Sequence, residues 1–405
     1  MLSALTNAAI FTHSQILPLH FLTMGENGSN LDSMAIRSRY IAAQLKRDLE
    51  VKMVFVSGPR QVGKTTLARS LPGAKTGYLN WDVAEHRDRI LRRELPPGKL
   101  WIFDEIHKYR QWRNYLKGLY DSKREGQRIL VTGSGKLDFY RFGGDSLQGR
   151  YHSLRLHPFS VAELGINRIP ELRDLLKLGG FPEPWLSGNE TEARRWSREY
   201  RSRLVEEDVS SLERIQDLGQ LELMMISLPD RVGSPLSINN LREDLQVSHK
   251  TASSWLAVLE RLYAIFRLSP IGSPRIRAVK KEQKHYHHDW SLITQDGPRF
   301  ENLVACHLLK WVHYRQDTEG LDWDLRYFRD RDGREVDFVV TDRGTPVLLV
   351  ECKWTDGDTD RNLKYLKARF PKAEAWQISA VGKKDYVSPE GVRVAPGLRL
   401  LQNLI

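Results

Sequence analysis

The chain has 405 residues and a formal charge of +11 at pH 7. Its length exceeds one ordinary core, so two or three domains are expected, and its 40% hydrophobic and 9% aromatic residues exclude a disordered chain. No apolar run approaches the roughly 20 residues needed to cross a bilayer, so no membrane association is expected. The excess of Lys and Arg either favours a polyanionic partner or is a solubilising surface.

Only two cysteines occur, Cys306 and Cys352. They allow neither a disulfide framework nor a cysteine-based metal site, which fits a reducing cytoplasm. Residues 1–35 lack helix caps, periodicity and the basic start of a signal peptide, so they are expected to be a poorly ordered leader, and Met24 or Met34 could be the actual start. Organised sequence is expected from a short helix at 36–40.

The first chemical motif follows an apolar strand at 53–56, in the run MVFVSGPRQVGKTT, which contains the phosphate-binding pattern G-x-x-x-x-G-K-[ST]. Glycines let the backbone curl so that its amides point at phosphate oxygens. Lys64 is expected to reach the β- and γ-phosphates of ATP, and the Thr65 hydroxyl to bind Mg²⁺. The residues expected to contact the nucleotide are Gly58, Pro59, Arg60, Gln61, Val62, Gly63, Lys64, Thr65 and Thr66.

Further strands with polar ends complete the predicted ATPase domain, residues 36–165. A strand at 99–103 ends in Asp104, assigned to Mg²⁺, and Glu105, assigned to activating water. The strand at 129–133 ends near Ser134, a candidate sensor of the γ-phosphate. Arg150 is a candidate arginine finger for a neighbouring subunit, or else an ordinary surface ion pair. Alternating strands and helices, with strands also at 77–80 and 154–156, indicate an α/β fold with a parallel sheet.

These segments carry a resemblance to a known family. The runs GPRQVGKTTL, DE after a strand, TGS, and GR followed by LHPFSVAEL resemble the prokaryotic and archaeal AAA-type P-loop ATPases of the additional-strand class, in which a restriction-endonuclease-like domain of uncharacterised role follows. The resemblance covers nearly the whole chain from about residue 36. It implies an oligomeric ATPase, such as a ring, with DNA as a substrate.

The middle of the chain is predicted to be helical. Residues 166–230 are interpreted as a helical lid, with a turn at 179–185 and a charged helix at 190–215 whose apolar stripe belongs to the core. Residues 231–277 are interpreted as a winged helix-turn-helix, with helices at 237–245 and 249–263 and a wing strand at 264–268. Its exposed residues His249, Lys250, Thr251 and Ser253 could contact DNA, although such domains also serve only for packing.

The last predicted domain, residues 278–405, holds a second group of polar residues. Glu301 lies in the expected first turn of a helix, Asp337 interrupts an apolar strand, and Glu351 and Lys353 share one face of the next strand. This set resembles the PD-(D/E)xK nuclease core, which implies that Glu301, Asp337 and Glu351 bind Mg²⁺ beside Lys353. The alternatives are an inactive nuclease fold that binds DNA, or an internal Glu351–Lys353 ion-pair network.

Three functions remain open from the sequence. The first is a cytoplasmic Mg²⁺-dependent ATPase that acts as a homo-oligomer on duplex or branched DNA, such as a Holliday junction, by translocation or remodelling. The second is a nucleotide-controlled signalling or defence switch whose C-terminal domain binds a protein partner. The third is a nuclease regulated by ATP.

Overall fold

The structure, a computed structural model, describes residues 38–134, 147–209, 217–272 and 283–405. The predicted leader and its two candidate start methionines lie outside this range. The short helix expected at 36–40 begins later, because Arg39 and Tyr40 precede the first helix, α1 (Ala42–Val51). In the described part of the chain, no helix is both long and apolar enough to span a membrane.

A five-stranded parallel sheet forms the N-terminal part of the fold, as predicted. Its strands are ordered β2-β3-β4-β1-β5, so β4 lies between β1 and β3 as the additional strand. The strands are β1 (Met53–Ser57), β2 (Tyr78–Asn80), β3 (Leu100–Asp104), β4 (Arg128–Thr132) and β5 (Tyr151–Arg155), and the helices are α2 (Lys64–Arg69), α3 (Ala74–Gly77), α4 (Ala84–Arg92) and α5 (Trp112–Asp121).

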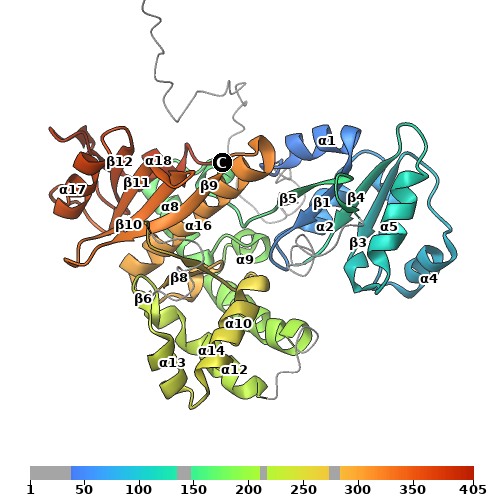
Figure 1. Cartoon of the computed structure of the whole chain (residues 1–405), viewed down its shortest axis with the longest axis horizontal. Coiled ribbons are helices and arrows are strands. Elements are labelled where there is room, and N and C mark those ends of the chain that lie inside the picture. Colours follow the sequence, from blue (N-terminus) through green and yellow to red (C-terminus); the bar gives the residue numbers. More distant parts are fainter. Residues whose placement is uncertain (1–37, 135–146, 210–216, 273–282) are drawn as a thin grey trace, which may run out of the picture. The chain divides into compact units, whose positions relative to one another are not determined.

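Both faces of this sheet are covered, as its continuous apolar strands require. Val54 and Val56 of β1 pack in the cluster that includes residues of α1 and α2. Met53 and Phe55, one residue out of phase, pack in the cluster that includes residues of α4 and α5. The carboxyl ends of β1, β3 and β4 therefore meet at one edge of the sheet (Figure 1), where Val56 and Asp104 each lie opposite Thr132.

The middle of the chain is helical, with one small sheet. The charged helix α10 ends at Arg203, earlier than predicted, and continues as a π-helical segment, Leu204–Val209, before residues 210–216 leave the described range. The predicted apolar stripe, Trp196, Tyr200, Leu204 and Val205, is buried in the core, as expected. The helices are α7 (Val161–Leu164), α8 (Ile169–Leu178), α9 (Pro182–Ser187), α10 (Glu190–Arg203), α12 (Leu218–Ser227), α13 (Ile238–Asp244) and α14 (His249–Arg261).

Two details of this region differ from or extend the prediction. The segment expected as a turn at 179–185 contains α9, because Pro182 sits in its first turn with a φ suited to helix initiation. The helices α13 and α14 are joined by a tight turn with Gln246 at φ 52°. The strands β6 (Pro235–Leu236), β7 (Ile265–Leu268) and β8 (Gln283–His287) form an antiparallel sheet in the order β6-β8-β7.

The C-terminal part begins with the long helix α16 (Asp296–Glu319), which packs along a six-stranded sheet (Figure 1). The other face of the sheet is covered by α17, with Leu363 and Leu366 in the core. The strands are ordered β13-β14-β12-β11-β10-β9. They are β9 (Trp323–Arg329), β10 (Glu335–Asp342), β11 (Thr345–Lys353), β12 (Glu374–Ser379), β13 (Tyr386–Val387) and β14 (Arg393–Pro396), and the remaining helices are α17 (Arg361–Arg369) and α18 (Gly397–Leu401).

Candidate functional site

The loop after β1 has the backbone that a phosphate cradle needs. Gly58 and Gly63 have φ values of 143° and 96°, and Gln61 is also left-handed at 57°. A Cβ at Gly58 would lie 2.2 Å from the carbonyl oxygen of Leu156, so only glycine fits there. Gly58 is therefore required by close approach as well as by backbone angle, and Gly63 by backbone angle.

The Lys64 side chain folds back onto the loop that precedes it. Its side chain is buried, and its Nζ donates to the carbonyl oxygens of Gly58 at 3.0 Å and Pro59 at 2.5 Å. Among its neighbours in the motif, Pro59 and Val62 are also buried, whereas Arg60 is half-buried and Gln61 and Thr66 are exposed. The ammonium therefore lies at the mouth of the curled backbone, where a phosphate would meet it.

Asp104 is the centre of a hydrogen-bonded group at the edge of the sheet. The Thr65 hydroxyl donates to Asp104 Oδ2 at 2.7 Å, and the Thr132 hydroxyl donates to Oδ1 at 2.6 Å. The Tyr78 hydroxyl also donates to Oδ2, at 2.6 Å. A hydroxyl and a carboxylate in contact are the oxygen ligands that the Mg²⁺ of a bound nucleotide requires, so Thr65 and Asp104 fit the assignment made from the sequence.

Glu105 is held in a strained backbone conformation beside this group. Its φ is 57°, rare for a residue other than glycine, and its amide donates to the carbonyl oxygen of Thr132 at 2.9 Å. Burial raises the pKa of its carboxyl above the ordinary value, against the opposing charges of Lys64 and Lys108. A carboxylate with a raised pKa accepts a proton more readily, as water activation requires.

A buried ion-pair cluster contacts the phosphate loop at the Val62 carbonyl. Arg39 donates to the carbonyl oxygens of Val62, at 2.6 Å, and His157, and pairs with Glu163 at 3.0 Å. Glu163 also pairs with Lys310 of α16. Although burial alone would raise it, Lys310 and Arg39 hold the pKa of Glu163 at about 2. A continuous set of polar contacts therefore joins the phosphate loop to α16.

The other two predicted catalytic residues lie further from this centre. Ser134 is buried just beyond β4, on the carboxyl edge of the sheet. Arg150 lies at the opposite, amino edge, since its carbonyl accepts the amide of Met53, where β1 begins. Its guanidinium pairs with Asp121 at 2.8 Å, which is the surface ion pair considered as the alternative to an arginine finger. At this edge Arg150 is far from its own phosphate loop, so a finger role would concern the nucleotide of another subunit.

Sequence reasoning missed several residues of this site. Thr132 lies one position before the Gly133–Ser134 pair that drew attention, and the alternation of β4 would have pointed to it. Tyr78 gave the weaker signal of a tyrosine beginning a strand. Arg39 and Lys310 gave no local signal, because Glu163, the carboxylate that both pair with, lies more than 100 positions from each.

The predicted nuclease-like residues are brought together in the C-terminal part. Asp337 lies where the pairing of β10 with β9 shifts register, a kind of irregularity that often redirects a functional side chain. Its amide donates to Glu351 Oε2 at 3.3 Å, and Lys353 Nζ pairs with Glu351 Oε1 at 2.8 Å. Glu301 lies in the second turn of α16 and not, as predicted, in the first, because the helix begins at Asp296.

Lys284, which sequence reasoning did not single out, lies among these carboxylates. Its Nζ is 2.6 Å from Glu335, 3.4 Å from Asp337 and 3.5 Å from Glu301. Burial and the neighbouring Asp337 carboxylate raise the pKa of Glu301, against the opposing charge of Lys284, and the same two causes raise the pKa of Glu351, against Lys353. Across the described residues, no three side chains of His, Cys, Asp or Glu form a group that could hold a metal ion. With Lys284 in place, the cluster does not fit the expected Mg²⁺.

The predicted DNA-contacting residues lie at the start of α14. His249 and Lys250 are exposed, and Thr251 and Ser253 are half-buried. The Thr251 amide is used to cap the helix, donating to Ser248 Oγ at 3.0 Å. The opposite side of α14 is buried, with Trp255, Leu256 and Leu259, and Leu262 directly after the helix is buried too.

An open groove of about 850 Å³ lies elsewhere, between Pro270–Gly272, the end of β9 and the end of α17. Arg329, Arg331 and Arg369 line it and are exposed. Its apolar lining includes Ile271, Phe370 and the buried Phe328, and Asp330 also lines it. Arginines beside aromatic rings are the combination that binds phosphates and stacks on bases.

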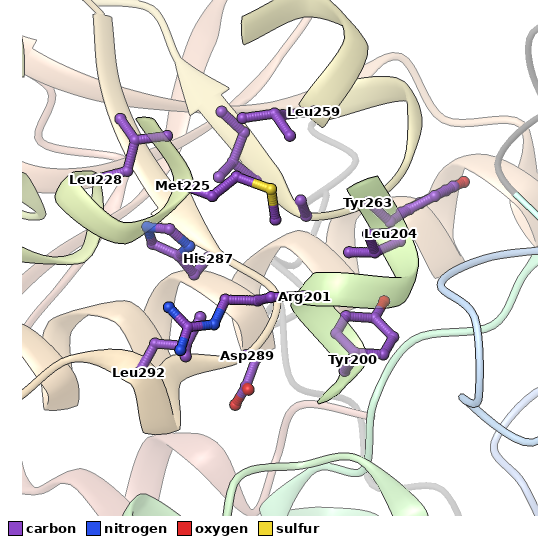
Figure 2. Close-up of a pocket in the computed structure, with 12 residues that line it drawn as sticks. Tyr200, Arg201, Leu204, Met225, Leu228, Leu259, Tyr263, His287, Asp289 and Leu292 are labelled. Atoms are coloured by element: carbon purple, nitrogen blue, oxygen red, sulfur yellow. The ribbon is translucent and has the colours of Figure 1, made fainter. Parts of the chain in front are cut away.

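One enclosed cavity lies among α10, α12, α14 and the residues after β8 (Figure 2). Figure 2 shows the Arg201 side chain extending between those of His287 and Asp289. The cavity measures about 20 Å³, room for about one water molecule and far below the several hundred Å³ of a ligand pocket. The apolar stripe of α10 is therefore core and does not line a cofactor site.

Three family models match consecutive parts of the chain. Residues 50–165 match an AAA domain, and residues 169–295 and 296–396 match two domains of unknown function, DUF8612 and DUF4143. An uncharacterized protein of Mycobacterium tuberculosis is 26% identical over 346 residues, 79% of this chain and 77% of that protein. One of Methanocaldococcus jannaschii is 22% identical over 383 residues, 84% of each chain.

Solved structures with a likeness to this chain are more distant. A Walker-type ATPase of Pyrococcus abyssi is 15% identical, with 63% of this chain and 96% of that chain covered and a TM-score of 0.39. A signal transduction ATPase with a tetratricopeptide repeat sensor, from Pyrococcus horikoshii, is 12% identical, with 68% and 47% covered and a TM-score of 0.20. Residues 50–165 match the AAA domain, and their phosphate loop and Asp104 have the arrangement expected of a P-loop ATPase.

Proposed function

We propose that this chain binds MgATP at the loop between β1 and α2 and hydrolyses it. The observation that carries the proposal is the contact between Thr65 Oγ1 and Asp104 Oδ2, 2.7 Å long, beside the buried Lys64 ammonium. Those groups are the hydroxyl, carboxylate and cation that a nucleotide's Mg²⁺ and phosphates require.

The remaining residues of the site have complementary roles in this proposal. Lys64 exchanges the carbonyls of Gly58 and Pro59 for phosphate oxygens when nucleotide enters. Glu105 takes a proton from the water that attacks the γ-phosphorus, and the bond to the leaving ADP oxygen breaks as the new bond forms. Ser134, at the same edge of the sheet, contacts the γ-phosphate.

We further propose that the ATPase acts on DNA, duplex or branched. The charge of +11 and the arginines of the open groove support a polyanionic partner. Lys250 and His249 supply a second exposed basic site at the start of α14. Because Arg150 lies at the edge of the sheet away from its own nucleotide, this proposal includes a homo-oligomer, such as a ring, in which Arg150 leaves Asp121 to reach the neighbour's γ-phosphate.

The test measures ATP hydrolysis with and without linear, single-stranded and four-way DNA. Lys64→Ala is expected to abolish hydrolysis, and its failure to do so would contradict the nucleotide site. DNA is expected to stimulate the wild type and to bind less tightly as salt rises. Arg331→Ala with Arg369→Ala should weaken binding and reduce this salt dependence, whereas the matched change Arg195→Ala, an exposed arginine paired with Glu192 on α10, should not. Hydrolysis without any DNA binding would remove the DNA half alone.

A second function is favoured by one observation, the polar contacts from Val62 through Arg39 and Glu163 to Lys310. They suit a switch in which nucleotide at the loop changes how the C-terminal part presents itself to a protein partner. Limited proteolysis of the wild type with ADP and with a non-hydrolysable ATP analogue would test it. Identical digestion patterns, with nucleotide binding verified, would contradict the switch.

A further inference from the structure

The Lys284 ammonium is enclosed by three carboxylates of the C-terminal part of the fold. The side chain comes from β8, outside the six-stranded sheet, and is 0% exposed. Besides Glu335, Asp337 and Glu301, its Nζ faces the ring of Tyr327 at 5.5 Å from the ring centre. A buried ammonium is tolerated only when it is paired, and these contacts supply three carboxylates and an aromatic face.

The carboxylates that would hold a metal are already engaged. Glu301 Oε1 accepts from the Tyr286 hydroxyl at 2.7 Å, and Asp337 Oδ2 accepts from the Cys352 amide at 2.9 Å. Both oxygens of Glu351 accept as well, one from Lys353 and one from the Asp337 amide. Mg²⁺ needs six oxygen ligands at about 2.0–2.1 Å, several of them water, and the Lys284 ammonium already lies within 3.5 Å of Glu301 and Asp337, two of the three carboxylates expected to hold the ion.

Charge leads to the same conclusion as geometry. A divalent cation placed between Glu301 and Asp337 would stand beside the ammonium, and like charges a few Å apart repel strongly in a buried site. Removing Lys284 from the cluster would require breaking its contacts with Glu335, Asp337 and Glu301 at once. The single positive charge therefore occupies the place of the ion.

We propose that Lys284 is a built-in cation that holds the carboxylates of Glu301, Glu335 and Asp337 together in place of a divalent metal. The cluster is then a structural ion-pair network, and the C-terminal part engages its partner without cleaving a phosphodiester. The proposal is independent of the ATPase function, since it concerns only residues of β8, α16 and β10.

The test measures binding of Mn²⁺ alone, by the loss of the free-ion electron paramagnetic resonance signal, in full-length protein without nucleotide. Lys64→Ala is included as the background, so that the phosphate loop does not contribute. The protein with Lys284 intact is expected to bind no Mn²⁺ at 1 mM, a concentration on the order of the dissociation constant of a weak carboxylate site. Lys284→Met keeps the side-chain length without the charge. This variant is expected to bind one Mn²⁺ at least about tenfold more tightly than the protein with Lys284, and adding Asp337→Asn should abolish this binding.

Two outcomes would overturn the proposal. One is Mn²⁺ binding by the protein with Lys284 intact that Asp337→Asn removes. The other is a folded Lys284→Met variant that gains no Mn²⁺. If Lys284→Met does not fold, Lys284→Ala and the intact protein are compared by thermal melting with and without 1 mM Mn²⁺. Stabilisation of the intact protein that is lost in Asp337→Asn contradicts the proposal, and stabilisation of Lys284→Ala alone supports it.

Discussion

Replacing Lys310 by methionine should destabilise the folded chain by about 3–5 kcal/mol, the usual cost of removing one member of a buried ion pair. Lys310 is 2% exposed and Glu163 6%, so neither charge can turn to water. Methionine keeps most of the apolar stem of lysine, and the change therefore removes the charge with little loss of packing. Glu163 would keep Arg39 as its cationic partner, together with the Tyr40 amide, which donates to its Oε1 at 3.0 Å.

The pKa changes show how this pair contributes, although Lys310 shares the shift of Glu163 with Arg39, which the variant keeps. Burial would raise the pKa of Glu163, but Lys310 and Arg39 lower it from 4.5 to about 2, a difference worth about 3 kcal/mol. Because the folded pKa is the lower one, this stabilisation is complete well above pH 4.5 and is lost as the pH falls towards 2. Burial also lowers the pKa of Lys310 from 10.5 to about 8. The intact pair therefore adds little net stability, although removing one partner is costly.

Urea denaturation followed by tryptophan fluorescence measures the effect, provided that the denaturant slopes of the variants agree. The difference between wild type and Lys310→Met should be smaller at pH 3 than at pH 7. Lys177→Met removes an exposed ion pair with Glu190, whose side chains are 50% and 49% exposed, and should change stability far less than Lys310→Met does. The double variant Glu163→Gln, Lys310→Met should recover only part of the loss, because it also leaves the buried Arg39 without its carboxylate partner. A cost below about 1 kcal/mol for Lys310→Met would refute the reasoning.

Three further changes test the nucleotide site. Glu105→Gln should lower kcat at least about 100-fold with little change in ATP affinity, measured by phosphate release and by titration with a fluorescent ATP analogue, and an unchanged kcat would remove the assigned role. Gly58→Ala should weaken ATP binding at least about tenfold, because its Cβ would lie 2.2 Å from the Leu156 carbonyl, whereas Gly118→Ala, with open space around it, should not. Thr132→Val should raise the Mg²⁺ concentration needed for half-maximal activity by about 10–100-fold, because it removes a hydrogen bond to Asp104. An unchanged Mg²⁺ requirement would contradict that role.

The proximity of Lys64, Thr65 and Asp104 could be predicted from the sequence. Lys64 and Thr65 begin α2 directly after the loop, and Asp104 is at the end of an apolar strand, where parallel strands bring such ends to one edge. The ion pairs of Lys310 and Lys284 could not be predicted, since they join residues far apart. Lys284 in particular reads as one lysine in a strand rich in histidine and tyrosine, and only the tertiary packing places it among carboxylates.

Helix boundaries were less accurate for a related reason. The apolar pattern begins at Phe300 and therefore predicts Glu301 in the first turn of a helix. The helix starts at Asp296 instead, with Pro298 in its opening turn. The resemblance to nucleases also directed attention to Glu351 and Lys353 as catalytic groups. Their direct 2.8 Å ion pair is the alternative that the same residues allowed.

The helix α16 makes two separate sets of buried polar contacts. Glu301 meets Lys284 and Tyr286, and Lys310, nine positions later, meets Glu163. Nine residues of helix span about 13 Å, and one inserted or deleted residue would rotate one end against the other by about 100°. Evolution can therefore vary the side chains of this stretch far more freely than its length, and insertions in related chains should fall outside residues 301–310.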